Sequence, residues 1–408
     1  MTAPVVTIRA IANGGDGVGT LEDGRTVFVP RTAVGDQVRL RDLKRGKSFA
    51  RAHVAEVVVA GPGRVTPACP HYDGDRCGSC QLMHLDGATQ RAAKARIVGD
   101  ALRRIGKLEV ADPDVVAAPH ELGYRAKVTF TWDGTRLGYH RLGQAEQRFS
   151  VRRCLLAEPT LQALHAALRT ALRHLPRRGA RVTLRSDATG DRHVIVRTED
   201  GPAWTGGAAL HEDLGARGEA AIIWWHPHGG APRVVAGSDN PWPATVFEQV
   251  HPAMGRMVRD AALEAAGDVA GRHAWDLYAG IGDTTRALVA RGATVDSVEA
   301  DRRAVALAEQ LGPAGPVRLA AMVEQAVISL RPPDVVLTNP PREGMAAEAC
   351  AVLADSAATR LVYVSCDPAT LARDLTRMAH AWQLVAVQAF DQFPQTAHVE
   401  CVATLERR

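Results

Sequence analysis

Two short segments of the chain place reactive side chains directly after predicted strands. Val-Ser-Cys-Asp-Pro at 364–368 follows an apolar strand, and Asn-Pro-Pro-Arg at 339–342 follows the strand before it. Because active sites of open α/β sheets lie at the carboxyl ends of their strands, both segments are expected to face one crevice. Cys366 in that place can act as a nucleophile. A free cysteine is as often a buried apolar residue, so position alone leaves both interpretations open.

A glycine-containing turn follows the first strand of the C-terminal part. The run from Asp276 to Gly282 contains Gly280, which lets the backbone approach a ligand closely. Glu299 ends the next strand, about 20 residues on, where a carboxylate can accept hydrogen bonds from both hydroxyls of a ribose. The third glycine of a dinucleotide-binding fingerprint is missing, so the pattern favours S-adenosylmethionine. An ordinary tight turn between a strand and a helix is the competing interpretation.

Seven cysteines in 408 residues do not form a disulfide scaffold, and their number is odd. Four of them can supply thiolates for a tetrahedral sulfur site: Cys69, Cys77, Cys80 and Cys154. Such a site holds zinc or an iron–sulfur cluster, and the sequence alone does not choose between them. Chance spacing is the alternative.

Length and composition set the limits of the fold. At 408 residues the chain predicts two or three domains. Hydrophobic residues make up 46% and charged residues 23%, which indicates a globular protein and excludes disordered, collagen-like and coiled-coil chains. Because the sequence contains no long apolar run and does not open with a secretory signal, we expect a cytoplasmic protein without a membrane span.

Three parts with different patterns follow one another. Residues 1–60 hold five predicted short strands with glycine-rich turns, which indicates an OB-like barrel. Residues 61–245 form an α+β domain with the cysteine loop, and its helix at 86–106 is free to pack on the third part. Residues 246–408 alternate strands and helices and end with two consecutive strands, which indicates a doubly wound, Rossmann-like sheet. The whole is a multidomain α/β protein.

The basic residues are concentrated near the N-terminus. The net charge is +4, but residues 1–160 hold 24 Lys and Arg against 17 Asp and Glu, a balance of +7. Six of these basic residues fall between Arg39 and Arg51. One interpretation of this run is an ordinary solvated hairpin. The other is a surface that contacts phosphates, because small barrels commonly bind oligonucleotides.

Several stretches of the chain match the motifs of one enzyme family. They are Cys69-x7-Cys77-x2-Cys80, Tyr124-Arg125, Phe247-Glu248-Gln249, 276–282, 339–342, 365–368, and Phe390-Asp391-Gln392-Phe393-Pro394-x-Thr396-x-His398-x-Glu400. With them, residues 69–408 resemble the RNA uracil-C5 methyltransferases, class I enzymes that make 5-methyluridine in transfer and ribosomal RNA. Residues 5–59 resemble the TRAM domain that is often fused in front of this catalytic unit.

The resemblance implies covalent chemistry. Uracil C5 is a poor nucleophile until a thiolate adds to C6, and a base must later remove the C5 proton. By resemblance Cys366 is the nucleophile and Glu400 the base. The expected contacts to S-adenosylmethionine are Gln249, Tyr278, Gly280, Asp283, Glu299 and Asn339. Asp283 and His251 stand where asparagine is common, and a further family contact falls near Met322.

The resemblance also favours a [4Fe–4S] cluster on the four cysteines of the loop, with zinc as the alternative. We expect this site to be structural or to position RNA. The TRAM-like module favours 23S ribosomal RNA as the substrate, with transfer RNA second. We expect the enzyme to act as a monomer.

Three other functions fit parts of the pattern. An amino-group methyltransferase would suit Asn-Pro-Pro, but it would need an aromatic residue where Arg342 stands. An RNA cytosine-C5 methyltransferase would need a cysteine within 338–342, and there is none. A non-catalytic RNA-binding or assembly protein could retain the fold. Cys366 and Glu400 argue against it.

Overall fold

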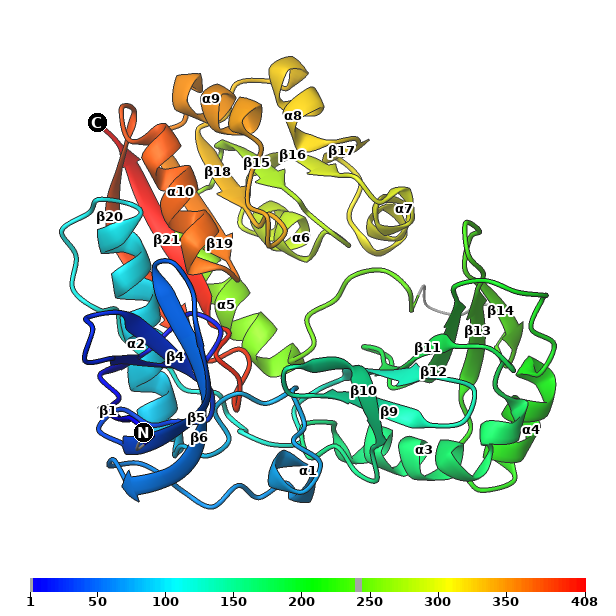
Figure 1. The fold of residues 1–408 in the computed structure, drawn as a ribbon. Coiled ribbons are helices and arrows are strands. Elements are labelled where there is room, and N and C mark those ends of the chain that lie inside the picture. Colours follow the sequence, from blue (N-terminus) through cyan, green and yellow to red (C-terminus); the bar gives the residue numbers. More distant parts are fainter. Residues whose placement is uncertain (1–2, 239–243) are drawn as a thin grey trace.

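We describe the protein from a computed structural model that covers residues 3–238 and 244–408. Within these ranges three sheets follow one another along the chain, and apolar cores pack against each of them (Figure 1). None of the helices in the same ranges is long and apolar enough to cross a membrane.

The N-terminal sheet has the order β1-β5-β6-β4-β3-β2, and it encloses a small core that includes Val27, Val38 and Leu40. Its strands are β1 (Val5–Thr7), β2 (Ala10–Ile11), β3 (Gly17–Thr20), β4 (Thr26–Val29), β5 (Gln37–Arg45) and β6 (Phe49–Val59). Neighbours are antiparallel except β4 and β6. The sequence predicts five strands here and the sheet has six; between β1 and β2 the N–H of Ile8 bonds to Asp36 and that of Arg9 to Val18.

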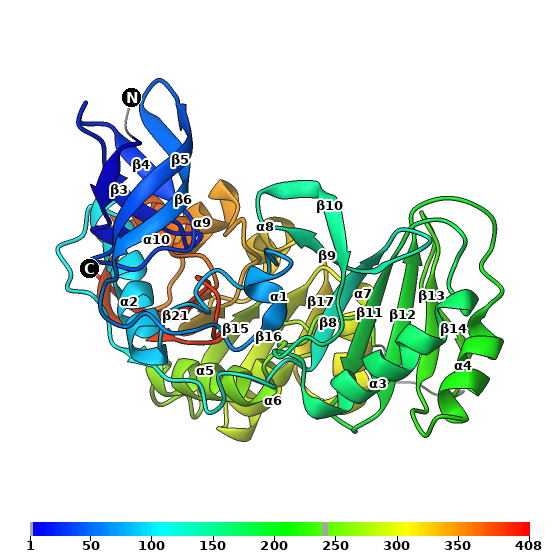
Figure 2. The ribbon, with the colours of Figure 1, turned by 60° about the horizontal axis from the view of Figure 1, so that its bottom comes forward.

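The central sheet has the order β10-β9-β8-β11-β12-β13-β14. Its strands are β8 (Lys127–Trp132), β9 (Leu137–Arg141), β10 (Gln144–Ser150), β11 (Ala180–Ser186), β12 (Arg192–Thr198), β13 (Ile222–His226) and β14 (Arg233–Ala236). Helices α3 (Pro159–Thr170) and α4 (Gly207–Gly215) cover one face of it (Figures 1 and 2). The short helix α1 (Pro70–Asp73) precedes the sheet, and the single turn η1 (Leu172–His174) follows α3.

The C-terminal sheet has the order β17-β16-β15-β18-β19-β21-β20-β7. Its strands are β15 (His273–Leu277), β16 (Thr294–Glu299), β17 (Val317–Ala320), β18 (Val335–Thr338), β19 (Arg360–Ser365), β20 (Trp382–Phe390) and β21 (Glu400–Arg407), with β7 (Val115–Val116) at the edge. Strands β15 to β19 run parallel, and β21 enters antiparallel between β19 and β20. This part therefore has the predicted doubly wound sheet, with two consecutive antiparallel strands at its end.

Helices cover both faces of that sheet. They are α5 (Pro252–Ala265), α6 (Asp283–Ala290), α7 (Arg302–Leu311), α8 (Val323–Ala326) with the turn η2 (Val327–Ser329), α9 (Ala347–Asp355) and α10 (Pro368–Met378). The core on one face includes residues of α8, α9 and α10, and the core on the other includes residues of α5 and α6.

One helix from the middle of the sequence also belongs to this third part. Helix α2 (Gly87–Arg104) begins at Asp86, whose carboxylate accepts the N–H of Thr89 at 2.7 Å. Val98 and Leu102 of α2 lie in the same apolar core as α10, and β7 pairs with β20. The chain thus packs residues 87–116 on the C-terminal sheet before it enters the central one.

Candidate active site

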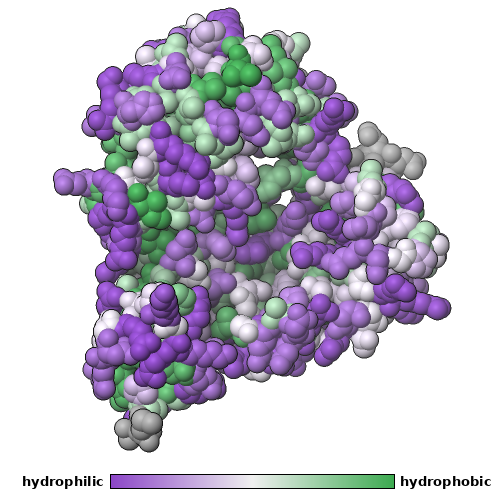
Figure 3. Space-filling model, turned by 45° about the horizontal axis from the view of Figure 1, so that its top comes forward, coloured by the Kyte–Doolittle hydropathy of each residue, from purple (hydrophilic) through white to green (hydrophobic). Residues whose placement is uncertain are grey.

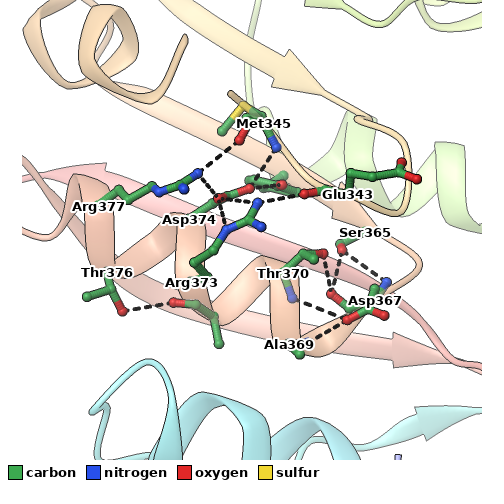
Figure 4. A network of polar contacts seen from close by, with 12 residues as sticks. Glu343, Met345, Ser365, Asp367, Ala369, Thr370, Arg373, Asp374, Thr376 and Arg377 are labelled. Carbon is green, nitrogen blue, oxygen red and sulfur yellow. Dashed lines mark hydrogen bonds and ion pairs between the residues drawn. The ribbon is translucent and has the colours of Figure 1, made fainter. Parts of the chain in front are cut away.

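Cys366 lies in the tight connection between β19 and α10. The Ser365 hydroxyl donates to the carbonyl of Asp367 at 3.0 Å, and the Asp367 carboxylate accepts the N–H groups of Ala369 and Thr370 at the start of α10 (Figure 4). These bonds fix the backbone on both sides of Cys366, which is half-buried. A thiol just before a helix N-terminus is close to the positive end of the helix dipole, which favours the thiolate.

Glu400 is the first residue of β21, the strand beside β19. Its neighbour Cys401 pairs with Ser365 across the ladder, so Glu400 and Cys366 come from adjacent strands. Glu400 is only 3% exposed, and burial raises its pKa to about 8. Burial and the nearby Glu400 also raise the pKa of the Cys366 thiol, while Arg342 lowers both pKa values. The structure therefore places the predicted base near enough to the predicted nucleophile to raise its pKa, and Arg342 near enough to act on both.

The loop that carries Arg342 is fixed by a buried carboxylate (Figure 4). Asp374 of α10 is fully buried and accepts from four donors: the N–H of Met345, the hydroxyl of Tyr363, and the guanidinium groups of Arg373 and Arg377. Gly344 has a φ of +75°, and a Cβ there would lie 2.5 Å from the Asp374 carboxylate. The close approach requires glycine, so the loop stays anchored over α10.

The predicted cofactor residues gather at the carboxyl ends of β15, β16 and β18. Both oxygens of Glu299 accept backbone N–H groups, from Gly280 at 2.9 Å and from Asp301 at 2.8 Å. Tyr278 has a φ of +60°, an uncommon conformation for a residue with a side chain. Asn339 donates its N–H to Leu277 at 3.1 Å, which holds its exposed side chain beside this turn.

Gln249, the remaining predicted cofactor residue, lies in the loop before α5. Gln392, which is fully buried in the loop between β20 and β21, donates its side-chain amide to the Gln249 carbonyl oxygen at 3.0 Å. Asp283 is different, because its carboxylate is already paired with Arg259 at 2.9 Å and with Arg286. Its role as a cofactor contact would require it to share these partners.

Two of the three departures from the family pattern, His251 and Met322, come from elements other than those of the reacting pair. His251 caps α5, stacks on Tyr124 at 4.7 Å between ring centroids, and has its pKa lowered to about 4 by burial. Met322 precedes α8 and is 47% exposed.

Cys69, Cys77, Cys80 and Cys154 converge from three segments. All four are free thiols, and Cys69, Cys80 and Cys154 pack around a cluster that includes Tyr72 and Tyr124. Burial raises the pKa of Cys69, Cys77 and Cys80, and the nearby cysteines of the set add to each of these shifts. In the described ranges no group of three or more His, Cys, Asp or Glu is arranged so that it could hold a metal ion.

Residues 391–399, the catalytic loop, connect β20 to Glu400, and the sequence reasoning missed the two α2 residues that hold this loop, Lys94 and Gln90. Lys94 of α2 is fully buried, forms an ion pair with Asp391 and donates to the Phe393 carbonyl at 3.0 Å. The amide of Gln90 accepts the N–H of Gln395 at 2.8 Å, and the Tyr124 hydroxyl donates to Pro394 at 2.9 Å. The sequence pattern of α2 could have pointed to Lys94, because it falls on the buried and mostly apolar face of the helix. A lysine in such a place needs a negatively charged partner.

Comparisons with known proteins agree with this geometry. The tRNA (uracil-5-)-methyltransferase family matches residues 327–408, which include Cys366 and Glu400. The 23S rRNA (uracil(1939)-C(5))-methyltransferase RlmD of Chromohalobacter salexigens is 34% identical, over 100% of this chain and 90% of that protein. RlmD of Acidithiobacillus ferrooxidans is 31% identical, over 98% of this chain and 97% of its own.

One solved structure has the same fold along nearly the whole chain. It is the Pyrococcus abyssi tRNA (uracil-54, C5)-methyltransferase in complex with S-adenosyl-L-homocysteine, with a TM-score of 0.74, 22% identity, and coverage of 98% of this chain and 100% of that one. Fold and site together define an S-adenosylmethionine-dependent RNA methyltransferase. The chain belongs to the RNA uracil-C5 methyltransferase family.

Proposed function

We propose that this protein methylates C5 of a uridine in 23S ribosomal RNA. The observation that carries the proposal is the half-buried Cys366 next to the buried Glu400 and near Arg342, at the strand edge that also holds Glu299. The RlmD relatives, which match this chain along almost its full length, are named for that reaction at uracil 1939.

The chain supplies a nucleophile and a base. The Cys366 thiolate adds to C6 of the uracil, a C–S bond forms, and C5 becomes an enolate carbon. S-adenosylmethionine, when bound, supplies an electrophilic methyl group for that carbon. The Glu400 carboxylate then takes the C5 proton, the C6–S bond breaks, and the thiolate is regenerated. Burial of Glu400 raises the basicity of its carboxylate.

The donor set near β15 suits the cofactor. Gly280 would meet nothing within 4 Å of an added Cβ, so the turn leaves open space beside its backbone. The Glu299 carboxylate is held by two N–H groups and keeps further lone pairs for ribose hydroxyls. We assign the contacts to Gln249, Tyr278, Gly280, Glu299 and Asn339, with Asp283 as a contact that would have to share its arginine partners.

We also propose an iron–sulfur cluster on Cys69, Cys77, Cys80 and Cys154. Three of the four cysteines pack around the cluster that includes Tyr72 and Tyr124, and the resemblance of the cysteine loop to the family supports an iron–sulfur cluster, with zinc as the alternative. Arg125, which lies near Cys80 and Cys154, would offset part of the cluster's charge.

The RNA would bind across the three parts of one chain. Figure 3 shows the surface hollowed between the C-terminal part and the other two, with many hydrophilic residues along the rim. The N-terminal sheet, as a TRAM-like module, would contribute affinity through its basic residues. Because one chain supplies every residue of the proposed site, we propose that the enzyme acts as a monomer on cytoplasmic RNA.

Transfer RNA is the second candidate substrate, because the matching family and the Pyrococcus structure are both named for it. The experiment is to map 5-methyluridine in 23S ribosomal RNA and in transfer RNA from a strain that lacks this protein, complemented with the wild type or with Cys366→Ala. We expect one 23S uridine to lose its methyl group and to regain it with the wild type alone. If 5-methyluridine were lost from transfer RNA only, transfer RNA would be the substrate and the proposal of 23S ribosomal RNA would be wrong.

A further inference from the structure

Two aromatic side chains lie together on the outside of the N-terminal sheet. Phe28 of β4 and Phe49 of β6 meet edge to face, with ring centroids 5.8 Å apart and an interplanar angle of 83°. Phe49 is 44% exposed, although the next residue, Ala50, is fully buried. The pair is therefore an apolar surface that faces solvent.

A cation completes this surface. Arg51 is paired in register with Phe28, and its guanidinium lies 5.7 Å from the Phe28 ring centroid and 5.9 Å from that of Phe49. One nitrogen of Arg51 contacts the Asp16 carboxylate at 3.2 Å, which fixes the side chain while 65% of it stays exposed. We call Phe28, Phe49 and Arg51 the aromatic platform.

The platform lies beside the most basic part of the chain. The β5–β6 hairpin, whose tip projects from the body of the molecule in Figure 2, carries exposed Lys44, Arg45 and Lys47. Arg45 lies 3.7 Å from Asp23, whereas Lys44 and Lys47 have no ion pair within residues 3–238 and 244–408. The ammonium groups of Lys44 and Lys47 can therefore bind phosphates close to the exposed ring of Phe49.

We infer that the aromatic platform and this hairpin bind a single-stranded segment of RNA, with a base stacked on Phe49 and the adjoining phosphates at Lys44 and Lys47. The inference rests on the proposed function for its ligand class and extends it to a named contact. Single-stranded binding sites combine aromatic faces with basic grooves, because every base has a π-face and every nucleotide a phosphate. In a duplex the paired bases are stacked on each other and are not free for Phe49.

The test measures binding of the full-length protein to a twelve-nucleotide oligoadenylate and to a twelve-base-pair RNA duplex over a range of salt. Phe49→Ala should weaken oligoadenylate binding about 5- to 100-fold, and Phe49→Trp should restore it. The slope of log K against log salt should not change, since no phosphate contact is lost. Lys44→Gln with Lys47→Gln should flatten that slope by about 1.4 for the single strand.

Two controls make the outcome decisive. Val58→Ala changes another exposed apolar residue of β6 and should leave binding unchanged, and the melting temperature of Phe49→Ala should stay near that of the wild type. Equal losses on duplex and single strand, a flattened slope for Phe49→Ala, or no loss at all would overturn the platform. These results are separable from the proposed function, because mapping of 5-methyluridine in 23S ribosomal RNA can succeed or fail whichever way Phe49 behaves.

Discussion

Burial and one arginine set the acid–base chemistry of the reacting pair. Glu400 carries a pKa raised to about 8, so at neutral pH most of it is protonated in the free enzyme. The Cys366 thiol also has its pKa raised, first by burial and then by Glu400. Arg342 opposes both shifts, and it is exposed at the mouth of the site. Both groups act as conjugate bases, so turnover should rise with pH through about pH 8, where Glu400 loses its proton, and should keep rising above it as the Cys366 thiol is deprotonated.

Arg342→Gln should move this rise to higher pH. The substitution removes the positive charge that lowers the two pKa values, so each group loses its proton later, by about one pH unit at most because Arg342 is exposed to solvent. The measurement is the single-turnover methylation rate from pH 6 to pH 10. Arg178→Gln, a control at an arginine that is 67% exposed in the central part, should leave the profile where it is. An unshifted profile for Arg342→Gln would contradict this account.

At the scale of elements, α2 holds the catalytic loop in place. Lys94 places a positive charge in the core, and burial lowers its pKa while Asp391 raises it. Removing the ammonium group of Lys94 leaves the buried Asp391 carboxylate without its partner. Lys94→Met should therefore lower the free energy of unfolding by about 3–5 kcal/mol. Urea unfolding measures this, and Lys94→Met combined with Asp391→Asn should recover part of the loss.

A neighbouring position supplies the comparison for Lys94. Arg96 lies on the same helix, and its side chain is 48% exposed. Arg96→Gln should therefore change the free energy of unfolding by less than about 1 kcal/mol. If the Lys94 and Arg96 variants proved equally stable, the ion pair would not be what anchors the loop.

The cysteine loop is a second element whose role can be measured. Protein purified without oxygen should be brown, and Cys80→Ser should remove the colour and destabilise the central part, since a ligated cluster contributes to folding. Binding of S-adenosylmethionine should survive, because the proposed contacts lie in the C-terminal part. A colourless protein with one zinc ion per chain would show that the cysteines bind zinc and not an iron–sulfur cluster. Loss of S-adenosylmethionine binding in Cys80→Ser would show that the C-terminal part depends on the central part.

The sequence predicts the parts of this molecule better than their connections. The alternation of strands and helices in the C-terminal part and the place of Cys366 at a strand end follow from local patterns, since strand ends are set by neighbouring residues, whereas the pairing of Cys366 with Glu400 is implied by the resemblance to the family. Lys94 and Asp391 are 297 residues apart, and no local pattern relates them. Strand β7 is two residues long and is defined by its partner β20 rather than by its own propensity.

At the scale of the whole molecule, we expect RNA binding and chemistry to be divided between the two ends of the chain. The basic hairpin of residues 37–59 is far in sequence from Cys366, and its contacts are expected to be mostly to phosphates. Replacing Arg41, Lys44, Arg45 and Lys47 by glutamine should raise KM for RNA more than it lowers saturated turnover. Steady-state kinetics at two salt concentrations would show this. Unchanged RNA affinity and salt dependence would mean that the hairpin is only a solvated surface.

The central claim is that Cys366 bonds covalently to uracil C6. The most direct measurement is to incubate the enzyme and S-adenosylmethionine with a 23S ribosomal RNA fragment that carries 5-fluorouridine at the target position, and to look for a complex that survives denaturation. Fluorine cannot leave as a proton does, so the wild type should be trapped. Glu400→Gln should accumulate a similar adduct even on ordinary uridine, because the C5 proton stays in place. Cys366→Ala should trap nothing, and a stable complex with that variant would contradict the account.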